Sequence, residues 1–263
     1  MAPIVCAYGG GTNSTAMLIR MVELKERVDL ILFADTGGEK PSTYAIVREF
    51  SSWLVARGYP EIITVRHNNK HGEVVTLEER CLSQGMLPSL AYGFKKCSLK
   101  FKRSPQDKFV NNWLPAKQAW KDGEKVIKLI GYDAEESHRL KSAPKDDPKY
   151  IYRYPLIDWD WCREDCLDAI DDSGITRPGK SACFFCPATK KHEIIRMLNE
   201  DPCLLERALK MEQNAMPKLQ TVMGLGRSYS WTNLVKADKA QMKLFPPDVV
   251  EQDCLCFDGS DDE

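Results

Sequence analysis

The segment that decides the fold reads Ile4-Val5-Cys6-Ala7-Tyr8, followed directly by Gly9-Gly10-Gly11-Thr12-Asn13-Ser14-Thr15. The first five residues form a short apolar run, which predicts a buried β-strand. The three glycines predict a tight loop, and the apolar residues that follow recur at helical spacing from Ser14 to Leu24. A strand that passes through a glycine loop into a helix is typical of ligand-binding α/β folds.

The same alternation continues along the chain. Further buried strands are predicted at Leu30–Ala34, Ile62–Val65 and Val126–Ile130, and a helix from Pro41 to about Arg57. Strands that alternate with helices at this spacing form a parallel sheet covered on both faces. We therefore predict an α/β fold, with a three-layer α/β/α, Rossmann-like parallel sheet. Ligands are expected at the carboxyl ends of its strands.

After residue 150 the alternation of strands and helices gives way to a mainly helical pattern. A short helix is predicted at Arg163–Asp172, and a longer helical pattern runs from Lys191 to Met211. The last residues, Asp258–Glu263, are acidic and small. We predict a nucleotide-binding α/β domain over residues 1–190 and a helical C-terminal extension with an acidic tail over residues 191–263.

Composition limits the classes of function. The 263 residues include 37 Lys and Arg against 38 Asp and Glu, so the net charge is −1. A chain this balanced does not wrap nucleic acid with a wholly basic domain, although a local basic patch is compatible with it. The sequence contains no apolar run of membrane-spanning length and no basic segment typical of a signal peptide, so we expect a cytoplasmic location and no membrane partner. Ten cysteines in a reducing compartment favour metal or redox chemistry over disulfides.

The glycine loop has a direct chemical interpretation. Glycines let backbone amides approach an anion closely, and the start of the following helix adds unpaired N–H groups and partial positive charge. The loop lacks the Gly-Lys-Ser/Thr of a Walker motif and the third glycine of a dinucleotide fingerprint. A phosphate cradle and a tight turn without a ligand are the two interpretations.

Four segments in the same order resemble one protein family. Gly9–Ser14 is similar to the pyrophosphate loop, Ser-Gly-Gly-x-Asp-Ser, of the adenine nucleotide alpha-hydrolase superfamily. The other three segments resemble the phosphoadenosine phosphosulfate (PAPS) reductase-like members of that superfamily: Asp35-Thr36-Gly37 with Pro41-Ser42-Thr43-Tyr44, Gly131–Arg139, and Tyr154–Trp159. The resemblance covers residues 4–190. Three positions depart from the family pattern: Gly9 replaces a serine, Asn13 an aspartate, and Asp133 an arginine.

The resemblance implies a site for ATP or a related adenine nucleotide. The nucleotide-binding residues would be Gly9, Gly10, Gly11, Thr12, Asn13, Ser14, Asp35, Thr36, Gly37, Gly131, Glu135 and Arg139. Glu135 or Glu136 would help hold Mg²⁺. Arg139 has a planar fork that matches phosphate or sulfate oxygens, and a surface pairing with Glu135 is the alternative. Asn13, Arg139 and Cys97 are the expected catalytic residues.

Cys97 and the Cys183-Phe184-Phe185-Cys186 segment resemble the iron–sulfur subgroup of sulfonucleotide reductases. Lys96 stands where that subgroup has its first cysteine, so three thiolates remain: Cys97, Cys183 and Cys186. They would hold a [4Fe–4S] cluster with one iron open, or take a fourth ligand from Cys162, Cys166, Cys254 or Cys256. Zinc completed by His192, and free thiols, are the alternatives. Three further cysteines are expected to be small buried apolar residues: Cys6, Cys81 and Cys203.

Two other features remain. Asp253-Cys254-Leu255-Cys256 partly resembles the mobile C-terminal segment on which PAPS reductases carry their nucleophilic cysteine. The stretch Lys95–Lys108 carries six positive charges, with Phe94 and Phe101 interleaved. It is either a solvated face or a phosphate-binding rim suited to a nucleotide or a nucleic-acid backbone, with aromatic rings that stack on a base.

The expected function is ATP-dependent adenylation with iron–sulfur-assisted sulfur transfer to a nucleic-acid or small-molecule acceptor. A sulfur donor or a reductant would be a partner. Two alternatives stay open: a phosphoadenylyl or adenylyl sulfate reductase with a cysteine nucleophile, and a non-catalytic nucleotide-binding module. The identity of the acceptor and the oligomeric state are not determined by the sequence.

Overall fold

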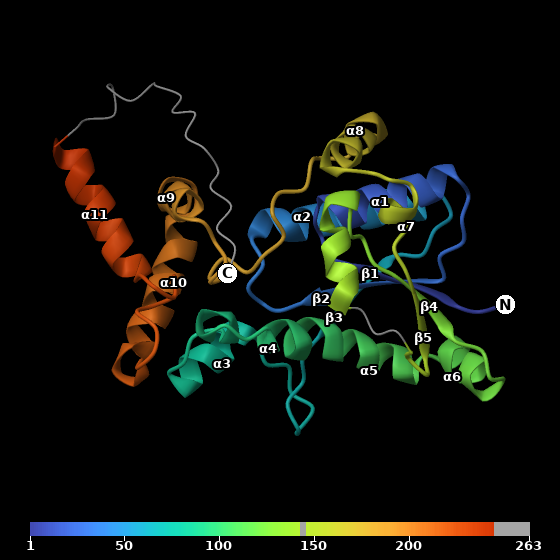
Figure 1. The fold of residues 1–263 in the computed structure, drawn as a ribbon, viewed down its shortest axis with the longest axis horizontal. Coiled ribbons are helices and arrows are strands. Elements are labelled where there is room, and N and C mark those ends of the chain that lie inside the picture. Colours follow the sequence, from blue (N-terminus) through green and yellow to red (C-terminus); the bar gives the residue numbers. More distant parts are fainter. Residues whose placement is uncertain (143–145, 245–263) are drawn as a thin grey trace.

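A parallel five-stranded sheet forms the centre of the protein in the computed structural model, which describes residues 1–142 and 146–244 (Figure 1). The strand order is β3-β2-β1-β4-β5. All four neighbouring pairs run parallel. The strand bounds are β1 Ile4–Tyr8, β2 Leu30–Asp35, β3 Ile62–Arg66, β4 Val126–Leu129 and β5 Tyr150–Arg153. The prediction of an α/β fold with a parallel sheet is confirmed, and β5 is a strand that the sequence analysis did not anticipate.

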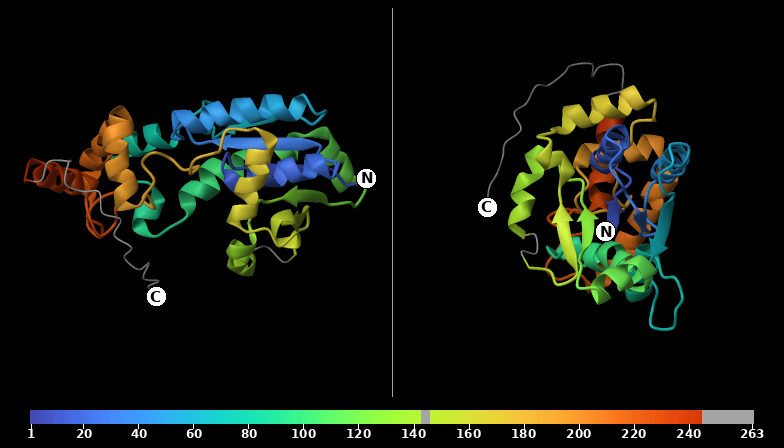
Figure 2. Two further views of the ribbon diagram at one scale, coloured as in Figure 1. Left: turned by 90° about the horizontal axis from the view of Figure 1, so that it is seen from above. Right: turned by 90° about the vertical axis from the view of Figure 1, so that its right-hand side faces the viewer.

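Helices cover both faces of the sheet, as the three-layer prediction requires (Figures 1 and 2). On one face lie α1 (Thr12–Glu23), α2 (Pro41–Val55), α7 (Pro155–Asp158) and α8 (Arg163–Ser173), which share a buried core with the sheet. On the other face α5 (Ser104–Asn112) and α6 (Leu114–Lys121) bury Val110 and Ala116 against the strands. All six residues of β2 are buried, because apolar side chains on both of its faces meet a helical layer.

The strand order fixes where a ligand can bind. The chain leaves β1 toward β2 on one side, and β4 adds to β1 on the other side. Two loops that leave neighbouring strands in opposite directions open a crevice between them at the carboxyl ends of the strands. The glycine loop after β1 and Gly131 after β4 lie at this switch point.

A third core lies beside the sheet (Figure 1). It joins α3 (Leu77–Gln84) and η1 (Ser89–Tyr92) to α9 (Lys191–Glu200), α10 (Pro202–Ala215) and α11 (Trp231–Leu244). Phe184 and Phe185 are buried at its centre. This core therefore combines residues from both sides of position 190. A short 3-10 turn, η4 (Met216–Lys218), follows α10, and the predicted acidic tail lies outside the described residues.

The helical pattern predicted from Lys191 to Met211 is confirmed and consists of two helices, α9 and α10. Asp201 leaves the helical conformation with φ −135°, and Pro202 begins α10. Proline lacks the backbone N–H that a continuous helix needs, but it suits the first turn of a new one. No helix within residues 1–142 and 146–244 has both the length and the apolar character required to cross a bilayer.

Candidate functional site

The glycine loop is closed by its own hydroxyl groups. The Gly9 amide donates to Ser14 Oγ at 3.1 Å, and Thr15 Oγ1 donates to the Gly11 carbonyl at 2.9 Å. Gly10 has φ +74°, and a Cβ there would lie 3.1 Å from both Phe33 and Thr43. The α1 helix begins after Gly11 without a side-chain cap and without an acidic residue in its first turn. Its first backbone N–H groups are therefore suited to an anion.

Gly131 brings the end of β4 against this loop. A Cβ on Gly131 would lie 2.9 Å from Ser14 Cα and 3.0 Å from Ser14 N. Only glycine permits that approach, because the obstructing atoms belong to the backbone. Gly131 therefore shapes the glycine loop by close packing.

Two of the three departures from the family pattern contact each other. Asn13 Nδ2 donates to Asp133 Oδ2 at 2.8 Å and lies 3.3 Å from Glu136 Oε2. Asp133 is 4% exposed and also accepts from the Glu136 amide at 3.0 Å. Asn13 Oδ1 is buried without a hydrogen-bond partner. The carboxylate of Asp133, from the segment after β4, therefore lies against position 13 of the glycine loop.

Arg139 pairs with Glu136. Arg139 Nη1 lies 2.9 Å from Glu136 Oε1, and its guanidinium lies 5.2 Å from the centre of the Tyr132 ring. Arg139 and Glu136 both belong to η3 (Ala134–Ser142), a 3-10 segment in which side chains three positions apart lie over one another. Glu135 is exposed, so Glu136 is the glutamate that lies against the glycine loop.

Asp35 is fully engaged by protein donors. Arg66 Nε and Nη2 each lie 2.8 Å from Asp35 Oδ2. Tyr44 Oη and the Gly37 amide donate to Oδ1, each at 2.7 Å. Burial and the bond to Asp35 raise the pKa of Tyr44. Asp35, which was expected to accept from the nucleoside, therefore holds β3 and α2 in place beside the site.

A pocket of about 350 Å³ opens at the carboxyl ends of β1, β2 and β4; we call it the switch-point pocket. Tyr132 and Tyr154 lie in its wall with their rings stacked, 5.7 Å apart and inclined by 17°. Such rings offer an apolar platform for a planar base. Four cations also line this pocket: Lys102, Arg103, Lys128 and Arg139. Its size and lining suit an anionic small molecule.

Lys128 was not anticipated as a site residue, although its signal was visible as a lysine inside the apolar strand Val126–Leu129. It is 5% exposed and is paired with Asp107 at 2.8 Å. The Tyr132–Tyr154 pair was also missed, because the two rings come from segments that only the sheet brings together. Glu39 was missed as well; its side chain is fully buried and Oε1 lies 3.0 Å from Lys102 Nζ.

The three predicted thiols lie in one neighbourhood. Cys183 Sγ lies 3.0 Å from Thr36 Oγ1, and the Cys186 amide donates to the Cys183 carbonyl at 2.9 Å. Burial raises the pKa of Cys183 to about 12 and raises that of Cys186, to which the nearby Cys97 also contributes. Lys102 is held beside Cys183 and Cys186, where its positive charge favours their thiolate forms.

Within the ranges that the structure describes, no three His, Cys, Asp or Glu side chains are arranged around a common point as ligands of a single metal ion. His192, the proposed fourth zinc ligand, is exposed at the start of α9. Three soft donors beside the half-buried Lys102 nevertheless fit the chemistry of a thiolate-bound cluster, which needs more space between its sulfurs than one ion does.

Among the other described cysteines, Cys81 lies near Cys97 and lines the same pocket. Cys166 belongs to the core between α1 and α8, and Cys162 precedes α8. Cys6 and Cys81 are buried as expected, whereas Cys203 is exposed at the start of α10, so the expectation for Cys203 was wrong. Cys254 and Cys256 lie outside the described residues.

The basic stretch Lys95–Lys108 is divided between different surfaces. Its middle part forms α4 (Lys96–Ser98) and the π-helix η2 (Leu99–Arg103). Lys102 and Arg103 line the switch-point pocket, whereas Lys96, Cys97 and Lys100 line a separate apolar pocket on the opposite side of the helix. Phe101 is 2% exposed and packs in the third core, so it does not provide the stacking surface that was predicted. Phe94 is 57% exposed.

Comparison with known proteins gave no match, either to a family model or to a curated protein.

Proposed function

We propose that the protein binds ATP or a related adenine nucleotide in the switch-point pocket and transfers the adenylyl group of ATP to an acceptor, with release of pyrophosphate. A sulfide-level sulfur nucleophile then attacks the adenylated acceptor and displaces AMP. Four cations at the carboxyl ends of parallel strands, beside a glycine loop with open helix N–H groups, support this assignment most directly. The resemblance of four ordered segments to PAPS reductase-like proteins supports it independently.

The residues would divide the work by their chemistry. Backbone amides at Gly10 and Gly11 would hold the pyrophosphate part, and Arg139 would neutralise charge that develops on it. The stacked Tyr132–Tyr154 pair would hold the base. Asp133 and Glu136 would hold Mg²⁺, which favours one or two carboxylates together with phosphate oxygens.

The sulfur chemistry would take place at the three thiols, next to the bound nucleotide. Cys97, Cys183 and Cys186 would hold an iron–sulfur cluster, which supplies a site for sulfide or electrons when bound. Lys102 lies between this group and the switch-point pocket and bonds Glu39 at 3.0 Å. Its positive charge would attract both the thiolates and the nucleotide phosphates.

A nucleotide-binding module without catalysis is the second candidate. It is favoured by Asn13, which is a neutral amide at the position where the resembled family has an aspartate, and which donates a hydrogen bond to Asp133. Reduction of PAPS or adenylyl sulfate is a third candidate, and its proposed cysteine nucleophile, Cys254, falls outside the described residues.

Calorimetric titration with ATP and a measurement of pyrophosphate release would test the assignment. Arg139→Ala should weaken ATP binding by about tenfold or more, since it removes a charged contact to phosphate. The control is Arg196→Ala, an exposed arginine on α9 whose side chain is 67% exposed. Binding without turnover, with every acceptor tried, would assign the protein to the second candidate. Equal ATP affinity in both variants would refute the proposed site.

A further inference from the structure

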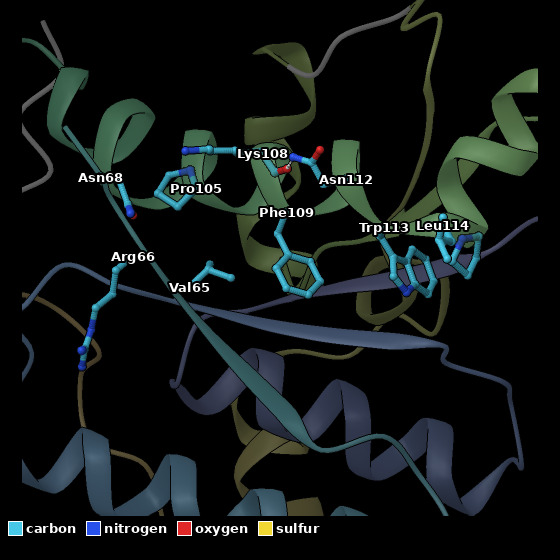
Figure 3. A pocket seen from close by; sticks show the side chains of 10 residues that line it. Val65, Arg66, Asn68, Pro105, Lys108, Phe109, Asn112, Trp113 and Leu114 are labelled. Atoms are coloured by element: carbon cyan, nitrogen blue, oxygen red, sulfur yellow. Dashed lines mark hydrogen bonds between the residues drawn. The ribbon is translucent and has the colours of Figure 1, made fainter. Parts of the chain in front are cut away.

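A second cavity lies at the β3 edge of the sheet, between β3 and the junction of α5 with α6 (Figure 3). Its volume is about 620 Å³, and we call it the β3–α5 pocket. Ten described residues line it, of which two are basic and none is acidic. Neither the glycine loop nor the thiols contribute to it, so it is distinct from the switch-point pocket.

Two aromatic side chains form its wall. Phe109 lies in the second half of α5 and Trp113 is the extended residue that ends that helix; both line the pocket. Figure 3 shows the Phe109 ring pointing from α5 toward β3, between Val65 and Trp113. Both rings are half-buried, so part of each faces the cavity. Half-exposed aromatic rings of this kind are suited to stacking on a planar base.

Polar residues also line this pocket. Arg66 directs its side chain away from the rings, with Nε and Nη2 on Asp35 at 2.8 Å, whereas Lys108 is exposed (Figure 3). Asn68 Nδ2 donates to the Gly72 carbonyl at 2.7 Å, and Asn112 Nδ2 donates to the Lys108 carbonyl at 2.9 Å. Each amide is thereby oriented through its nitrogen. Its carbonyl oxygen remains suited to accept a hydrogen bond from a base edge.

The positive charges continue between the two pockets. Lys102 and Arg103 line the switch-point pocket, and Lys108 lines the β3–α5 pocket five residues further along the same helical segment. A chain with regularly repeated negative charge matches cations placed in this way. Aromatic stacking together with side-chain amides favours a nucleic-acid strand over an acidic peptide, which has no planar base to stack.

We propose that the β3–α5 pocket binds one nucleotide of a single-stranded nucleic acid, with its base against Phe109 and Trp113 and its phosphate on Lys108. The inference rests on the proposed function in one respect: it makes the acceptor a nucleic acid whose reacting part reaches the switch-point pocket.

Fluorescence anisotropy with a labelled single-stranded oligothymidylate of ~10 nucleotides would test the pocket. Phe109→Leu keeps an apolar side chain but removes the ring, and should weaken binding by about tenfold. Lys108→Ala should weaken binding and reduce the slope of log affinity against log salt by about 0.7, as expected for one lost phosphate contact. Lys117→Ala, an exposed lysine on α6 outside the pocket, is the matched control and should change neither quantity.

Three outcomes would overturn the inference: no oligonucleotide binding by the intact protein, equal binding by Phe109→Leu and the control, or equal displacement of the oligonucleotide by polyglutamate of the same charge. Thermal melting identifies a variant that has lost its fold, in which case Asn112→Ala, an exposed position, replaces it. ATP titration separates the two proposals. A protein that binds the oligonucleotide through Phe109 but does not bind ATP contradicts the proposed function and leaves this inference intact, and the reverse result contradicts the inference alone.

Discussion

The contact between Asn13 and Asp133 makes a sharp prediction about the glycine loop. Asn13 Nδ2 now donates to Asp133 Oδ2 at 2.8 Å, and Asp133 is only 4% exposed. Asn13→Asp would replace this hydrogen bond with two carboxylates facing each other. Two unit charges about 4 Å apart repel by about 4 kcal/mol at an effective dielectric constant of 20. The lost hydrogen bond to a charged acceptor adds about 1.5–3 kcal/mol. Because Asn13 is only half-buried and the loop can relax, we expect the free energy of unfolding to fall by about 2–4 kcal/mol.

The exchanged pair provides the control. Asn13→Asp combined with Asp133→Asn keeps the size of both side chains and restores one amide and one carboxylate, with the donor on the other side. We expect this double variant to lie within about 1 kcal/mol of the original protein, so that the two substitutions are strongly coupled.

Urea unfolding at pH 7, followed by far-ultraviolet circular dichroism, would measure all four proteins of the cycle. ATP titration of the same proteins would show whether the loop keeps its shape. If Asn13→Asp is as stable as the original protein, or if the double variant is no better than the single one, the two side chains do not interact as the structure indicates.

Other predictions concern the loop, the third core and the thiols. Gly131→Ala should disrupt the glycine loop and abolish ATP binding by calorimetry, because its Cβ would lie 2.9 Å from Ser14 Cα, whereas Gly179→Ala meets nothing within 4 Å and should be neutral. Glu212→Gln should cost about 3 kcal/mol in thermal or urea unfolding, because the buried Glu212 accepts five hydrogen bonds and an amide nitrogen would face donors; the exposed Glu206→Gln is its control. Iodoacetamide at pH 8 should modify Cys203 much faster than Cys81 when peptides are followed by mass spectrometry, since burial raises the pKa of Cys81 to about 12 and its thiolate forms only as the pH approaches that value; equal rates would contradict the burial. Protein purified without oxygen should absorb near ~400 nm if the three thiols hold an iron–sulfur cluster, and Cys183→Ala should remove that absorption; an unchanged spectrum would exclude the assignment.

The position of the candidate site in the fold could be predicted from the sequence, but the contacts between its side chains could not. The glycine loop, the segment after β2 and the segment after β4 were each expected at the carboxyl end of a strand, and the parallel sheet brings them together there. The partners inside the site were not predictable. The alternative role considered for Arg139 was an ion pair with Glu135, four positions away as in an α-helix. Because η3 is a 3-10 segment, Arg139 instead pairs with Glu136, three positions away.

The sequence by itself determined the elements whose signal is local. Buried runs such as Leu30–Ala34, the glycines at strand ends and the helical spacing of α1 and α2 depend on neighbours along the chain, and all appear as expected. The tertiary structure decided what depends on residues far apart in sequence. The short edge strand β5 forms because β4 offers it an edge, the Asn13–Asp133 contact spans 120 positions, and Phe101 is buried because the C-terminal helices cover it. Local patterns report which face of a segment is apolar, whereas partner, depth and charge environment are set only when the segments pack together.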